Sequence, residues 1–207
     1  MPRSTHSKPR PLTTRGAATK LRIVEAAASL AYVTGAGRMN LDEVMEASGT
    51  SKSQLYHYFE DKDALVREVI GLQTNRVLQA NAVHLDCLDS FQALRAWRDV
   101  MVAANRAGGG IGGCPIGSLA NELAAQSEDA RNLLVESFEA WSRIIETGLV
   151  RMKERGRIVP SADTEAISIA VLAAIQGGIL LSKTARNSKP LELAFDMALA
   201  HIERHAV

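Results

Sequence analysis

A short polar segment that begins at Lys52 carries the side chains best suited to bind nucleic acid. Such side chains donate hydrogen bonds to phosphate oxygens or bond to base edges. Leu55 and Phe59, four residues apart, would anchor one face of a helix in a core. A helix of about two turns would therefore present the polar side chains on its other faces. These residues are Lys52, Ser53, Gln54, Tyr56 and His57.

Capping signals delimit this helix and the one before it. Ser51 and Gln54 form a capping-box pattern, and Asn40 has the residue type that opens the preceding helix. Gly49 can adopt the left-handed conformation that ends a helix, so that Thr50 leads directly into the next one. Two short helices joined by a tight glycine turn predict a helix-turn-helix, although a helical hairpin without DNA binding satisfies the same pattern.

Two of these side chains have alternative interpretations. Gln54 either caps its own helix or reads a base, because one amide cannot do both at once. Lys62 lies where a cation opposes the helix dipole unless an anion is present. That anion is either a DNA phosphate or the carboxylate of Asp61 or Asp63. Both alternatives stay open from the sequence.

Helical periodicity extends over almost the whole chain, and no segment alternates apolar and polar residues as a strand would. The sequence therefore predicts an all-α protein of about nine helices. We expect a disordered basic arm over 1–14, a three-helix helix-turn-helix domain over 15–62, and a larger helical ligand-binding and dimerisation domain over 63–207. The expected helices cover 16–34, 41–49, 52–58, 62–83, 88–106, 117–126, 128–154, 162–185 and 190–204.

Composition narrows the class of protein. Apolar residues make up 46% of the chain, which is enough for a core, and the first 22 residues hold six Lys/Arg and no acid. The longest apolar stretch, 169–181, is too short and too interrupted for a membrane span. Cys87 and Cys114 have no paired spacing, so neither a disulfide nor a zinc site is indicated. We expect a cytoplasmic protein without membrane contact.

Bulky and polar residues of the larger domain are candidates for a ligand chamber. Such chambers are apolar, with a few polar groups that orient the ligand. For each residue the alternative is ordinary core packing, because an aromatic side chain at helical spacing usually fills space. The candidates are Trp97, Met101, Asn105, Asn121, Phe138, Trp141 and Gln176.

Two patterns that could indicate enzymes do not meet the requirements. The glycines over 108–117 are followed by no lysine and preceded by no strand, so a flexible hinge is favoured over a phosphate-binding loop. His201 and His205 have metal-ligand spacing, but Glu203 is not placed as in zinc proteases. We expect no enzyme, no metal and no cofactor.

The last two expected helices carry residues suited to helix–helix contact between subunits. Small residues in the first allow close approach, and the second presents a set of apolar side chains. We therefore expect a homodimer that forms through these two helices. The residues are Ala170, Ala173, Ala174, Gly177 and Gly178 in the first, and Leu191, Ala194, Phe195, Ala198 and Ile202 in the second.

Residues 15–66 resemble the N-terminal domain of the TetR family, on the motif ASGTSKSQLYHYFEDKDAL that ends at Leu65. The stretch 108–123, GGGIGGCPIGSLANEL, looks like the C-terminal domain of the LmrA and YxaF subgroup. Gly is usual in the family where Ser53 stands, and Thr where Asn40 stands, so the base preference cannot be transferred. The resemblance implies base or nearby phosphate contacts for Lys52, Ser53 and Gln54, and backbone contacts for Asn40, Tyr56, His57 and Lys62, with Thr50 completing the candidate set.

The resemblance further implies a dimer that binds a palindromic double-stranded operator and is released by a small hydrophobic effector. Repression is the commoner mode in the family. We expect the ligand to displace the helix over 128–154, which pushes the fourth helix and moves the two DNA-binding heads off the spacing that the operator requires. The alternatives are a helical ligand-binding or interaction module without DNA binding and a metal-dependent enzyme. Neither the effector, the operator nor the direction of control can be identified from the sequence.

Overall fold

The computed structural model describes residues 12–207, and within them it contains nine helices and no strand beyond an isolated bridge between Ile158 and Ala206. The all-α prediction is confirmed. The expected arm lies mostly on residues 1–11, outside the described part, and Thr14 already belongs to the first helix. The helices are α1 (Thr14–Thr34), α2 (Leu41–Ser48), α3 (Lys52–Tyr58), α4 (Lys62–Leu85), α5 (Phe91–Ala107), α6 (Pro115–Leu123), α7 (Glu128–Glu154), α8 (Thr164–Ala185) and α9 (Lys189–Glu203).

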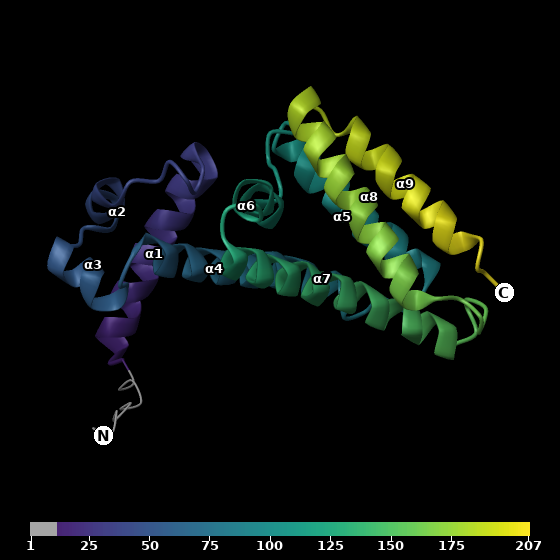
Figure 1. The fold of residues 1–207 in the computed structure, drawn as a ribbon. Helices are drawn as coiled ribbons and strands as arrows, with labels where there is room; N and C mark the ends of the chain where they lie inside the picture. Colours follow the sequence, from purple (N-terminus) through teal and green to yellow (C-terminus); the bar gives the residue numbers. More distant parts are fainter. Residues whose placement is uncertain (1–11) are drawn as a thin grey trace, which may run out of the picture.

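Helices α1 to α3 form a small head at one end of the molecule (Figure 1). Ile23 of α1, Val44 of α2 and Leu55 of α3 are completely buried, and Phe59 closes the same core just after α3. Gly49 has φ 61°, the left-handed conformation that ends α2 and lets α3 begin within three residues. The head therefore follows from the caps and turn that the sequence shows.

Helices α4 and α7 pack along each other and connect the head with α5, α8 and α9 (Figure 1). Helix α7 buries an apolar stripe that runs from Trp141 through Ile145 and Leu149 to Met152. Gly148 lies on the same helix, and a Cβ there would overlap the side chain of Leu88. The glycine thus permits close approach of α7 to the segment that follows α4.

Three helix starts differ from the expected positions because other residues supply the caps. Helix α6 begins at Pro115, with the Cys114 sulfur accepting from the backbone N–H of Gly117 at 3.4 Å. Asp163 rather than Ser161 caps α8, and Ser90 caps α5. Because cap residues lie close together in this sequence, local pattern placed these boundaries only to within two or three residues.

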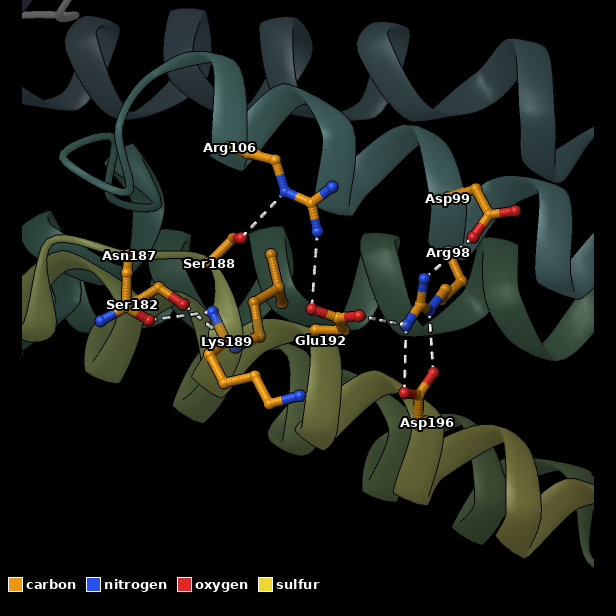
Figure 2. Close-up of polar contacts among 10 residues, drawn as sticks. Arg98, Asp99, Arg106, Ser182, Asn187, Ser188, Lys189, Glu192 and Asp196 are labelled. Atoms are coloured by element: carbon orange, nitrogen blue, oxygen red, sulfur yellow. Dashed lines mark hydrogen bonds and ion pairs between the residues drawn. The ribbon is translucent and has the colours of Figure 1, made fainter.

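Helices α8 and α9 pack tightly within one chain. A Cβ on Gly178 would lie 2.8 Å from the Cα of Leu191, so only glycine fits at this crossing. The backbone N–H of Leu191 donates to Ser182 Oγ at 3.0 Å, near the turn drawn in Figure 2. The prediction that α9 presents five apolar residues to a partner subunit is wrong for four of them. Leu191, Phe195, Ala198 and Ile202 are buried inside the protomer.

A cluster of ion pairs joins α5 to α9 (Figure 2). Arg98 donates twice to Asp196, at 2.8 and 3.0 Å, and also pairs with Asp99 and Glu192. These hydrogen bonds, above all the one to Asp196, raise the pKa of Arg98, which stays charged. Arg106 reaches Glu192 from about two turns further along the same face of α5. The cluster holds α9 in a fixed register against α5.

By length and composition alone, α8 is long and apolar enough to cross a membrane. The same helix packs against α7 on one side and α9 on another, so much of its apolar character belongs to the interior. Its outer face still exposes Ile169, Leu180 and Leu181, and α9 exposes Leu193 and Met197 beside it. Several exposed large apolar side chains on two neighbouring helices suit a contact with another molecule.

Candidate nucleic-acid interface and ligand cavity

Helix α3 is a short platform anchored on one side and exposed on the others. Leu55 is completely buried, whereas Lys52, Ser53, Tyr56 and His57 are exposed. The Lys52 ammonium lies 6.0 Å from the centre of the Tyr56 ring, so these two side chains form one surface. Four side chains with donor groups are thus presented together, as a contact with phosphates and base edges requires.

Gln54 and Asn40, two of the residues predicted to contact DNA, use their side chains to cap helices. The Oε1 of Gln54 accepts from the backbone N–H of Ser51 at 2.9 Å, and the Ser51 hydroxyl accepts from Gln54 N–H at 3.3 Å. The structure therefore favours the capping alternative for Gln54. Asn40 caps α2 by accepting from the N–H of Asp42 at 3.0 Å. Both side chains remain on the exposed side of the head.

The side chains of Thr50 and Lys62 contact protein groups that the sequence did not predict. Thr50 is buried, and its hydroxyl pairs with Ser48 at 2.7 Å, so its side chain is not presented to DNA. Lys62 Nζ donates to the backbone carbonyl of Gly37 at 2.6 Å. Asp61, one of the two acids expected to neutralise Lys62, instead caps α4 through the N–H of Ala64. The sequence could not show that the turn after α1 offers Lys62 a carbonyl.

A cavity of about 1090 Å³ opens between the end of α1, α6, α7 and α8. Its wall combines apolar side chains with hydroxyl, amide and charged groups, as in sites for small organic molecules. The lining residues are Thr34, Gly35, Gly113, Cys114, Gly117, Ser118, Ala120, Asn121, Glu122, Phe138, Gln176, Gly177, Ile179, Leu180, Lys183 and Thr184.

Of the seven residues predicted for a ligand chamber, Asn121, Phe138 and Gln176 line this cavity. The other four are not among its lining residues. Trp97 is completely buried in the core, where its indole N–H donates to Asn81 at 3.0 Å. Trp141 is likewise buried in the core, and Met101 and Asn105 are half-buried on α5. A large aromatic side chain fills space, so bulk was a poor guide to the wall of an open space.

Several lining residues at the start of α6 and at the end of α8 were missed by the sequence reasoning. Cys114, Gly117 and Ser118 lie on one wall of the cavity, and Lys183 and Thr184 lie on another. Close-packed interiors leave openings where side chains are small. The signal that could have found this site is the run of small residues from 108 to 123, which we interpreted as a hinge.

Cys114 and Gln176 meet at the cavity wall. Burial is the main effect that raises the pKa of the Cys114 thiol, against a smaller opposing hydrogen bond from the backbone N–H of Gly117. Cys114 is therefore neutral at physiological pH. Within residues 12–207 there is no group of three His, Cys, Asp or Glu side chains that could hold a metal ion. His201 and His205 stack edge to face with ring centres 5.5 Å apart.

Comparison with known proteins agrees with this geometry. Residues 23–69 match the family "Bacterial regulatory proteins, tetR family", which includes all of α2 and α3. Residues 90–197 match "Transcriptional regulator LmrA/YxaF-like, C-terminal domain", a span that contains α6, α7 and α8. The first match ends within α4, and the second begins just before α5.

Relatives with assigned roles share nearly the whole length of the chain. The HTH-type transcriptional regulator LmrA of Bacillus subtilis is 29% identical over 172 residues, which cover 82% of this chain and 89% of LmrA. A regulator from Cytophaga hutchinsonii has the same fold, with a TM-score of 0.83, 19% identity, and coverage of 96% and 99%. The regulator CifR, solved with a 26-base-pair operator, has a TM-score of 0.75 at 18% identity, covering 94% and 98%. The chain belongs to the TetR family of transcriptional regulators, with a DNA-binding head and a C-terminal domain of the LmrA/YxaF-like type, and it is not an enzyme.

Proposed function

We propose that this regulator binds a palindromic operator as a homodimer and is released when a small hydrophobic effector enters the cavity. The observation that carries the proposal is the presentation of Lys52, Ser53, Tyr56 and His57 on a helix anchored by Leu55. We expect these side chains to divide between base edges and phosphates, as in other helix-turn-helix proteins. Repression is the mode we expect, in the cytoplasm.

The exposed apolar face of α8 and α9 supports a dimer through these helices. Leu180 and Leu181 of α8 and Leu193 and Met197 of α9 are each more than half exposed in the protomer. A self-complementary face of this kind fits a two-fold interface, and a two-fold dimer places two α3 helices against one palindrome. Leu180 also lines the cavity, so a partner subunit would reduce its opening.

The composition of the cavity supports a hydrophobic effector with polar groups. Phe138, Ile179 and Leu180 supply apolar surface, and Asn121 and Gln176 supply hydrogen-bonding groups. One atom of the Gln176 amide, Nε2, is buried and has no hydrogen-bond partner among the described residues. A ligand group that binds this amide would satisfy it, which favours binding because an unpaired buried polar group is costly.

Selection of binding sites from a random duplex pool tests the DNA-binding proposal. We expect the purified protein to select a palindrome, with an affinity that falls steeply as salt rises. Lys52→Ala should weaken operator binding about tenfold at physiological salt, through the loss of a charged contact in each subunit. Arg157→Ala is the matched control, because it removes an exposed charge just beyond the C-terminal end of α7.

Failure of the selection would favour the alternative of a ligand-binding module without DNA binding. In that case the protein would bind no duplex even at low ionic strength. Release by an effector is tested separately. A library of apolar small molecules is screened for compounds that raise the melting temperature of the protein, and these compounds are then titrated against the operator complex. Compounds that stabilise the protein but leave operator affinity unchanged would count against an effector role for the cavity.

A further inference from the structure

The turn between α1 and α2 is held by a carboxylate of the larger domain. The backbone N–H groups of Ala36 and Gly37 donate to the two oxygens of Glu122 on α6, at 2.8 and 2.5 Å. Hydrogen bonds to an ionised acceptor are among the stronger ones in proteins. The partners are more than 80 residues apart in sequence, so the contact joins the head directly to α6, which lies beside it in Figure 1.

The backbone of this turn is shaped around that carboxylate. A Cβ on Gly37 would lie 2.9 Å from Glu122 Oε1, and one on Gly35 would lie 3.0 Å from the same atom. Gly35 also has φ 91°, which other residues rarely adopt. Successive N–H groups in such a turn form a concave site for an anion. Two glycines therefore let the Glu122 carboxylate reach backbone groups that a side chain would block.

A second contact fixes the end of α1 to the same side of the larger domain. The backbone N–H of Gly113 donates to the hydroxyl of Tyr32 at 3.1 Å, and the Lys183 ammonium lies 5.6 Å from the Tyr32 ring centre. Gly113, Glu122 and Lys183 all line the cavity. The contacts that dock the end of α1 on the α6–α8 side are thus made by the wall of the proposed effector site.

We propose that Glu122 is the positioning residue that holds the head in its DNA-binding orientation and transmits the state of the cavity to it. This inference rests on the proposed function and names the regulatory link of that site. The link runs from α6 to the turn after α1, whereas the sequence reasoning placed it from α7 to α4. Lys62, which begins α4 and donates to Gly37, ties α4 to the same turn.

The physical basis is that both oxygens of Glu122 already have partners in the turn. A ligand that displaces α6 must therefore either draw the turn along with it or break two charge-assisted hydrogen bonds. Either change alters how α1 and α2 sit on the larger domain, and α3 follows because it shares the core of the head. The coupling typical of allosteric proteins is 5- to 150-fold, about 1–3 kcal/mol, and the loss of two charge-assisted hydrogen bonds is an effect of that size.

Substitution of Glu122 in the full-length protein tests the positioning role. In Glu122→Gln the amide exchange of Ala36 and Gly37 should become about tenfold faster or more, while the amide of Leu55 keeps its wild-type rate. Operator affinity should fall about tenfold, although removal of a negative charge by itself favours DNA binding. Glu122→Asp, which keeps the carboxylate, should recover part of both effects. Glu136→Gln removes an exposed carboxylate on α7 as the matched control.

Cys114 provides a ligand-free reporter of coupling, because it lies in the cavity wall. Cys87 is exposed and is replaced with Ser, which leaves Cys114 as the remaining thiol. Binding of an operator duplex should change the rate at which Ellman's reagent labels Cys114 severalfold, since coupling between two sites is reciprocal. In the Cys87→Ser, Glu122→Gln protein the duplex should leave that rate unchanged.

The outcomes separate this inference from the proposed function. Unchanged exchange of Ala36 and Gly37 in Glu122→Gln would overturn the positioning role, whatever the protein binds. If the operator duplex does not change the labelling rate of Cys114 in the Cys87→Ser protein, the proposed coupling is wrong. If the wild-type protein binds no duplex but the exchange effect appears, the DNA-binding proposal is wrong and the structural role of Glu122 stands.

Discussion

The recognition helix and the ligand cavity differ in how their residues are brought together. All the exposed donors of α3 come from one stretch of six residues, Lys52 to His57, and its caps lie within that stretch or next to it. The cavity takes its wall from the end of α1, α6, α7 and α8, which are far apart in sequence. A surface built within one helix is fixed by local hydrogen bonds, whereas a cavity depends on how several helices pack.

This difference explains which parts of the protein can vary independently. A change of side chain on α3 alters the contact with DNA and leaves the core of the head in place, because only Leu55 of that helix is buried. A change in the cavity wall reaches further, since Gly113, Glu122 and Lys183 also hold the head. The proposed effector site therefore shares residues with the contacts that attach the DNA-binding head to the larger domain.

The largest expected effect is the loss of stability when a core residue of the larger domain is truncated, compared with a residue that lines the cavity. Trp97→Ala should lower the free energy of unfolding by about 3–5 kcal/mol, because it removes a buried ring that packs edge to face on Phe195. Phe138→Ala should cost clearly less, because Phe138 is half-buried and already faces open space. Urea unfolding at one fixed protein concentration measures both. Equal losses would mean that the cavity is closed in solution.

A prediction of intermediate size tests whether water reaches the Cys114 thiol in the cavity wall. Burial raises the pKa of the Cys114 thiol, so the folded state binds this proton more tightly than the unfolded state does. Stability is therefore complete below the ordinary thiol pKa and is lost as the pH rises above about 8.5, by at most about 1.4 kcal/mol per pH unit.

Thermal or urea unfolding from pH 7 to pH 10 in the Cys87→Ser background measures this loss. The Cys87→Ser, Cys114→Ser protein should lack that component, because serine does not ionise in this range. An identical pH profile for the two proteins would show that water reaches the Cys114 sulfur freely.

The smallest effect addresses the recognition helix. Gln54→Ala removes one half of the capping box and should cost about 1 kcal/mol of stability, and Ser51→Ala should cost a similar amount. Because the Gln54 amide is engaged with Ser51, both variants should weaken operator binding without changing the preferred base at any position. Relaxed preference at one position in Gln54→Ala alone would show that Gln54 leaves its cap to read a base.

Sequence reasoning succeeded where a signal is contained within a few residues. The capping box at Ser51 and Gln54, the cap at Asn40 and the left-handed Gly49 were all readable, and the motif that includes them led to the family. It failed at Thr50, whose exposure depends on how Ser48 packs, and at Trp97, whose partner Asn81 lies on a different helix. In both cases the outcome was decided by a neighbour that the pattern does not specify.

By itself the sequence determined the helices, the caps of α2 and α3 and the set of donors on α3, because each depends on side chains and backbone within one or two turns. Only the tertiary structure decided where the cavity lies and that Glu122 and Lys62 meet at the turn after α1. The physical reason is that such contacts join backbone groups and side chains from distant segments. Their geometry is set by the packing of whole helices against one another.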